Sequence, residues 1–105
     1  MGTEYIIKFD LDDPYQAERI LENAPCFSGR VEHQGQSFYE FRRPDSLGSM
    51  PDAMATIEPG GIYFCSYGRS EEILRAILGR VEAEFGETVL DDYEEYLESR
   101  RAGDS

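Results

Sequence analysis

Residues 4–24, EYIIKFDLDDPYQAERILENA, contain a strand pattern that is followed directly by a helix pattern. Polar and apolar side chains alternate in residues 4–10, with the period of two that is typical of a β-strand. Asp13 is then a preferred helix N-cap, and Pro14 suits the first helical position. The sequence therefore predicts that the fold begins with a strand and a helix. Their apolar faces are Tyr5, Ile7 and Phe9 in the strand, and Ala17, Ile20, Leu21 and Ala24 in the helix.

Two hairpins are predicted after this first helix. The first joins residues 27–33 to residues 37–42 through Gln34-Gly35-Gln36, and the second joins residues 55–58 to residues 62–67 through Pro59-Gly60-Gly61. Residues 43–54 lie between the hairpins and contain two Pro, one Gly and two Ser without a clear period. This composition predicts a loop of about a dozen residues and makes it a candidate functional loop.

A second helix is predicted after the hairpins, with Ser70 as its N-cap and Gly86 at its end. Its buried stripe is expected to consist of Ile73, Leu74, Ile77, Leu78, Val81 and Phe85. A short strand at residues 87–90 and a terminal helix capped by Asp91 or Asp92 complete the prediction.

The predicted order of elements resembles the ferredoxin-like arrangement, βαββαβ, with an inserted hairpin and an added C-terminal helix. We therefore expect an α+β fold with a mainly antiparallel sheet and both long helices on one face. A chain of 105 residues suits one domain with one core, so residues 1–105 are expected to form a single domain. Within it, residues 100–105 are expected to be a disordered tail.

The sequence predicts a cytoplasmic protein without membrane contact. No apolar run approaches the roughly 20 residues of a membrane-spanning helix, and the N-terminus lacks a signal-peptide pattern. In that compartment Cys26 and Cys65 are expected to be free, buried thiols. The one histidine, His33, is in phase with Phe27 and Val31 along its strand.

Charge is the strongest indicator of function, since the chain has a net charge of −12. The C-terminal stretch of residues 82–98 contains no basic residue, and its acidic residues are Glu82, Glu84, Glu87, Asp91, Asp92, Glu94, Glu95 and Glu98. Such a surface repels nucleic acid and accelerates encounter with basic proteins. Tyrosine is enriched at interfaces, so the predicted partner-binding residues are Tyr93, Glu94, Glu95, Tyr96 and Glu98. The alternative is that this stretch is only a solvated helix face.

The segment from Phe9 to Asp13 resembles the first motif of the haloacid-dehalogenase-like phosphatases. That resemblance implies an aspartate nucleophile at Asp10, an acid at Asp12 and a magnesium ion between them. The later Ser or Thr motif, the Lys and the larger parallel core of that family are absent from the sequence. Turn and N-cap roles explain the same aspartates more simply.

Residues 35–41, GQSFYEF, resemble the aromatic strand motif of RNA-recognition domains, which stack bases on a sheet. Affinity for RNA comes largely from cations that neutralise phosphates, and this chain has few to offer. We therefore predict that Phe38, Tyr39 and Phe41 serve the core and the sheet surface, and that the protein does not bind nucleic acid.

Catalytic and metal-binding residue sets are sparse. A nucleophilic pair of Cys65 and His33 is an open alternative, although Cys65 lies within an apolar run that predicts burial. One histidine and two distant cysteines cannot form a zinc site, so no cofactor is expected.

The sequence as a whole favours a non-catalytic protein-binding domain with a basic partner. In broad character it is similar to the acidic inhibitors and immunity proteins that neutralise basic nucleases. The alternatives are a magnesium-dependent phosphoryl-transfer enzyme that uses Asp10 and Asp12, and a structural homo-oligomer such as a homodimer.

Overall fold

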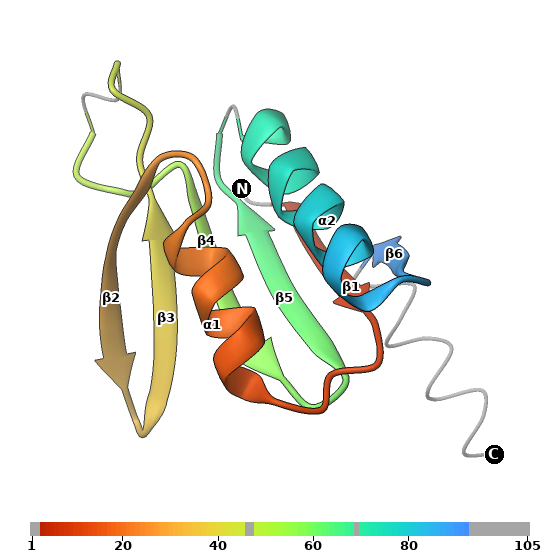
Figure 1. Ribbon diagram of the computed structural model, residues 1–105. Helices are drawn as coiled ribbons and strands as arrows, with labels where there is room; N and C mark the ends of the chain where they lie inside the picture. The colour runs from red at the N-terminus through yellow and green to blue at the C-terminus, as the bar shows by residue number, and fades with distance from the viewer. Residues whose placement is uncertain (1–2, 46–47, 69, 93–105) are drawn as a thin grey trace, which may run out of the picture.

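The computed structural model describes residues 3–45, 48–68 and 70–92. Within these ranges six strands form one antiparallel sheet in the order β2-β3-β4-β5-β1-β6, and two helices cover one of its faces (Figure 1). The predicted α+β class is therefore confirmed. In chain order the elements are β1 (Thr3–Lys8), α1 (Pro14–Glu22), β2 (Phe27–His33), β3 (Gln36–Phe41), β4 (Ala53–Glu58), β5 (Gly61–Ser66), α2 (Glu71–Phe85) and β6 (Val89–Asp92).

The sheet order differs from the predicted ferredoxin-like arrangement. A simple βαββαβ sheet places one strand between the two strands of its first βαβ unit, whereas three strands separate β1 from β2 here. The inserted hairpin causes the difference, because β4 pairs with β3 on one side and with β5 on the other. Ala53 and Ala55 of β4 are fully buried, so the insertion lies in the middle of the sheet.

The predicted short strand at residues 87–90 lies two residues further along the chain, at β6 (Val89–Asp92). Asp91 therefore does not cap a helix, because Asp91 and Asp92 pair with Ile6 and Tyr5 of β1. Pairing along β1 satisfies backbone N–H and C=O groups, which outweighs the N-cap preference of Asp91. The predicted terminal helix beyond Asp92 and the predicted tail lie in residues 93–105, outside the described residues.

The helix α1 begins and packs as predicted. The Asp13 carboxylate accepts a 3.0 Å hydrogen bond from the Tyr15 N–H, and Pro14 occupies the first helical position. Ala17, Ile20 and Leu21 are buried against the sheet, as their helical spacing predicts.

The ends of α2 are partly as predicted. Gly86 ends the helix with a φ of 83°, a left-handed conformation that suits glycine. Ser70 stands at the N-cap position, but its hydroxyl makes no capping bond. Ser70 is buried, and its hydroxyl donates a hydrogen bond to the Ser66 hydroxyl instead. This bond connects the start of α2 to the end of β5.

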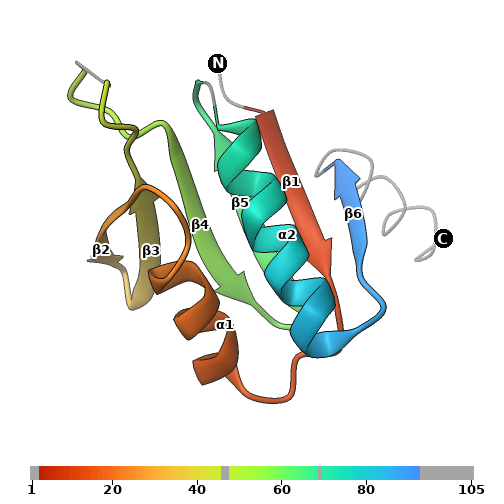
Figure 2. The same cartoon turned by 45° about the horizontal axis from the view of Figure 1, so that its top comes forward.

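The hydrophobic core fills the space between the sheet and the two helices. Figure 2 shows α1 nearer β4 and α2 nearer β5 and β1, so each helix covers part of the same face. The largest fully buried apolar side chains come from both layers and are Ile7, Ile20, Leu21, Phe41, Ile62, Phe64, Ile73, Ile77 and Val81.

The predicted loop at residues 43–54 is two residues shorter in the structure, because β4 begins at Ala53. The Arg42 guanidinium donates hydrogen bonds to the carbonyl oxygens of Gly48, Ser49 and Met50. The Asp52 carboxylate accepts a 2.7 Å bond from the Arg43 N–H. These bonds fix the described part of the loop to the end of β3.

Candidate functional site

A β-bulge in β2 places a charged residue on the helix-covered face of the sheet. Phe27 pairs with Phe41, but Gly29 pairs with Glu40, so the register shifts by one residue between them. Val31 and His33 therefore lie on the opposite face from Phe27, and their predicted common phase with Phe27 is wrong. Arg30 instead pairs with the core residue Tyr39 and faces the helices.

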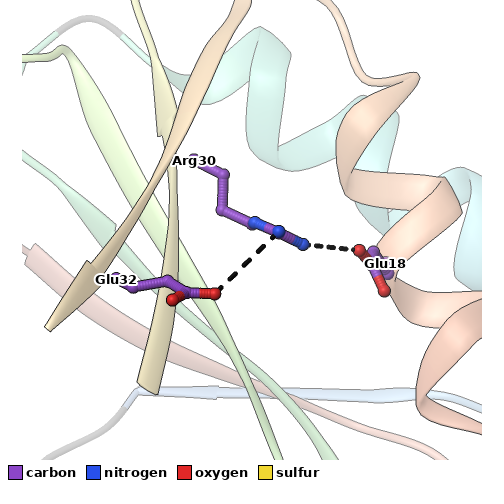
Figure 3. Close-up of polar contacts among 3 residues, drawn as sticks. All are labelled: Glu18, Arg30 and Glu32. Carbon is purple, nitrogen blue, oxygen red and sulfur yellow. Dashed lines mark hydrogen bonds and ion pairs between the residues drawn. The ribbon is translucent and has the colours of Figure 1, made fainter. Parts of the chain in front are cut away.

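Arg30 connects β2 to α1. Its guanidinium lies 2.8 Å from the Glu18 carboxylate and 3.9 Å from that of Glu32, as Figure 3 shows. Glu18 is on α1, and Glu32 is on the same strand as Arg30. The single guanidinium therefore forms ion pairs with carboxylates from two elements, α1 and β2.

A cavity of about 490 Å³ opens beside this ion pair, between α1, the β2–β3 hairpin and the β4–β5 turn. Its apolar lining includes Leu11, Pro14, Ile57 and Pro59 together with the ring of Tyr39. The charged residues in its lining are Asp12, Glu18, Arg30 and Glu58. We call this cavity, with its lining residues, the acidic pocket.

Tyr39 and Arg30 affect one another's protonation. Tyr39 is 2% exposed, and burial raises the pKa of its hydroxyl, while the adjacent Arg30 partly offsets that rise. The Tyr39 hydroxyl in turn raises the pKa of Arg30, and the carboxylates of Glu18 and Glu32 add to the effect. At neutral pH the pocket therefore holds a neutral phenol and a charged guanidinium.

Two acidic residues in the lining of the acidic pocket have no cationic partner among the described residues. Asp12 is exposed and Glu58 is half-buried, and neither forms an ion pair or a side-chain hydrogen bond with a residue in the described ranges. Glu18 is already paired with Arg30. Chemically, a lining that combines apolar and acidic residues suits the aliphatic stem and charged head of a lysine or arginine side chain.

The predicted partner-binding residues belong to a stretch that the structure describes only as far as Asp92. Tyr93, Glu94, Glu95, Tyr96 and Glu98 all lie outside the described residues. The upstream acidic residues Glu82, Glu84 and Glu87 are exposed on α2 and the connection that follows it. That part of the acidic stretch is thus a solvated surface in the structure.

The aspartates of the phosphatase-like segment occupy the loop between β1 and α1. Asp10 and Asp12 are both exposed, while the Asp13 carboxylate serves as the helix cap. In the described part of the chain, no three His, Cys, Asp or Glu side chains are grouped as metal ligands would be.

The possible nucleophile and base are on different strands of the sheet. Cys65 is 5% exposed on β5, where it pairs with Glu4 of β1. His33 is exposed at the hairpin end of β2, and β3 and β4 lie between the two strands. The structure therefore does not bring this pair together. Both cysteines are free, as predicted, although Cys26 is only half-buried.

The aromatic residues of β3 divide between the two faces of the sheet. Tyr39 and Phe41 are buried in the core, and Phe38 is half-buried on the opposite face. This division follows the predicted role of these residues in the core and on the sheet surface.

The sequence did not predict the acidic pocket, because its lining residues come from stretches that are far apart in the chain, from Leu11 to Gly60. Only the bulge places Arg30 beside α1, and a bulge of this kind has no signal beyond the Ser28-Gly29 dipeptide. The one indicator in the sequence was the single arginine of β2.

Comparison with known proteins adds no functional information. No protein-family model, curated protein or solved structure matches the chain. Among the described residues, neither helix has the length and apolar character that crossing a membrane requires.

Proposed function

We propose that this chain is a non-catalytic protein-binding domain that acts on a basic partner, in the manner of an inhibitor or immunity protein. One observation supports this proposal above the others: the lining of the acidic pocket combines apolar residues with Asp12 and Glu58, which form no ion pair with a residue in the described ranges. A lysine or arginine of the partner would bury its stem against Leu11 and Pro59. Its head would meet those carboxylates.

The charge of the whole chain supports the same proposal. With a net charge of −12, the protein attracts a basic partner from a distance and speeds their encounter. The pocket supplies what a charged surface lacks, namely a concave site where one anchoring side chain can be desolvated. In this proposal the residues 93–98 extend the acidic surface, while the pocket fixes the register of the complex.

Affinity capture with matched variants tests this function. The wild-type chain, the double variant Asp12→Asn with Glu58→Gln, and a control with Glu72→Gln and Glu82→Gln serve as baits at low salt. Both control positions are exposed on α2 and carry the same loss of charge. A further bait with Glu94→Gln, Glu95→Gln and Glu98→Gln measures the part played by the terminal acidic residues.

A basic protein should be recovered by the wild type and by the control, and at least tenfold less by the pocket variant. Higher ionic strength should weaken the capture, because it screens the attraction between exposed charges. Equal recovery by the pocket variant and the control would exclude the pocket as the docking site. Recovery of no basic protein at all would overturn the proposed function.

A further inference from the structure

The strand β2 forms an open edge of the sheet. It pairs with β3 on one side, and no strand among the described residues pairs with its other side (Figure 1). The side chains of residues 30–33 are all exposed, including Val31 at 48%. An open edge is a template for pairing with another chain, and proteins usually protect it with charged side chains, above all lysine, with proline or with a bulge. The register of β2 is regular from Gly29 onward, residues 29–33 contain neither lysine nor proline, and the two charges there, on Arg30 and Glu32, are opposite in sign.

The backbone groups of Arg30 and Glu32 point away from β3. The hairpin turn consists of Gln34 and Gly35, with φ values of 52° and 79°, and the pair His33 and Gln36 flanks it. In a two-residue turn of this kind the flanking pair is hydrogen-bonded, and the pairing alternates along the strand. Val31 therefore faces β3, while the N–H and C=O groups of Arg30 and Glu32 face outward.

Two hydrogen bonds on β3 independently support this alternation. The Phe41 carbonyl accepts a 2.9 Å bond from the Asp52 N–H, so it points toward β4. The neighbouring Glu40 carbonyl accepts a 3.0 Å bond from the Ser28 hydroxyl, so it points toward β2. Backbone direction alternates along a strand, so the N–H and C=O groups of Phe38, two residues before Glu40, also point toward β2. Phe38 pairs with Val31.

We infer that two copies of this chain pair through β2 in an antiparallel register that centres on Val31. In this register Arg30 of each copy lies opposite Glu32 of the other, and their outward N–H and C=O groups form the new hydrogen bonds. Val31 lies opposite Val31 of the second copy, on the face away from the helices. Two six-stranded sheets then become one continuous sheet, with all helices on the same face.

Charge selects this register over its neighbours. Only registers that match outward-facing residues with outward-facing residues are possible, so the alternatives are shifted by two residues. One shift places Arg30 opposite Arg30 of the second copy, and the other places Glu32 opposite Glu32. Like charges directly opposite each other destabilise a sheet, whereas the Val31-centred register has two opposite-charge pairs.

The other sheet edge is a poorer place for self-pairing. There β6 has only four residues, and it ends in Asp91 and Asp92. Two copies of that edge would bring acidic residues together, in a chain whose net charge already opposes self-association. In contrast, the charges of Arg30 and Glu32 balance within β2, so this edge adds no net repulsion.

A charge-swap experiment tests the pairing. Sedimentation equilibrium measures the mass of the full chain, which should be twice 12.0 kDa for the wild type at high protein concentration. The variants Glu32→Arg and Arg30→Glu should each be monomeric, because each places like charges opposite one another. An equimolar mixture of the two should dimerise again, since two arginines then face two glutamates. The variant Glu82→Arg has the same charge change as Glu32→Arg but places it on α2, away from β2, and it should dimerise more readily than Glu32→Arg or Arg30→Glu.

Amide hydrogen exchange identifies which edge is used. In the dimer the amide protons of Arg30 and Glu32 should exchange slowly, and their exchange should quicken on dilution. If Arg30→Glu fails to fold, the mass of Glu32→Arg and the amide exchange rates of the wild type still show whether β2 forms the dimer interface. The inference is overturned by a monomeric wild type, by a Glu32→Arg variant as dimeric as the wild type, or by a dimer in which both amides stay unprotected.

Discussion

The hydroxyl of Tyr63 donates a 2.5 Å hydrogen bond to the Glu4 carboxylate, from β5 to β1, on the face of the sheet away from the helices. Burial raises the pKa of Tyr63 far above its ordinary value of 10.0, and the bond to Glu4 raises it further. Burial also raises the pKa of Tyr67 on the same side, with a second contribution from Cys65. The folded protein therefore holds these phenol protons more tightly than the unfolded chain does.

We expect the free energy of unfolding to fall as the pH rises past about 10, where the unfolded tyrosines lose their protons. Each tyrosine that stays protonated only in the folded state contributes a slope of up to about 1.4 kcal/mol per pH unit. This stability is complete below the unfolded pKa and is lost as the pH approaches the higher folded pKa. Urea denaturation at several alkaline pH values measures the slope.

The variant Tyr63→Phe should flatten that alkaline slope, since it removes the proton with the most strongly raised pKa. Tyr15→Phe is the matched control, because Tyr15 is 72% exposed and should leave the slope unchanged. Equal slopes for Tyr63→Phe and the wild type would show that Tyr63 is not responsible.

The cap of α1 gives a second prediction. Asp13→Ala removes the hydrogen bond to the Tyr15 N–H and should lower the free energy of unfolding by about 1 kcal/mol. Asp12→Ala, one residue earlier, should change it by less than about 0.5 kcal/mol, because Asp12 is exposed and makes no such bond. Thermal denaturation of both variants at one pH compares them, and similar losses would contradict the capping role of Asp13.

Much of the local structure was predictable from sequence, because short-range rules govern it. Asp13 and Pro14 set the start of α1, and Gly86 set the end of α2. The sheet order was not predictable in the same way, since the place of β4 depends on pairing across the whole sheet. Pairing across the sheet also decided the extent of β6, because pairing with β1 outweighed the preference of Asp91 for a helix N-cap.

The candidate site was less predictable than the fold. Glu18 and Arg30 are 12 residues apart in sequence and meet only because a bulge rotates one strand and a helix covers it. Ordinary alternation places Arg30 on the solvent side of β2 and leaves no reason to connect it with α1. Net charge, in contrast, can be read from the sequence alone, and it led to the prediction of a basic partner without indicating the pocket.

Two glycine substitutions should change stability in opposite directions. A Cβ atom at Gly61 would lie 2.1 Å from the Ile7 carbonyl oxygen, so Gly61→Ala must displace the backbone of β1 or β5 and should lower the free energy of unfolding by at least about 2 kcal/mol.

A Cβ atom at Gly79, in contrast, would meet nothing within 4 Å, and the residue is exposed inside α2. Gly79→Ala should therefore stabilise the protein by about 1 kcal/mol, since alanine favours a helix interior over glycine. Urea denaturation measures both, and a Gly61→Ala variant as stable as the wild type would contradict the close approach of β1 and β5.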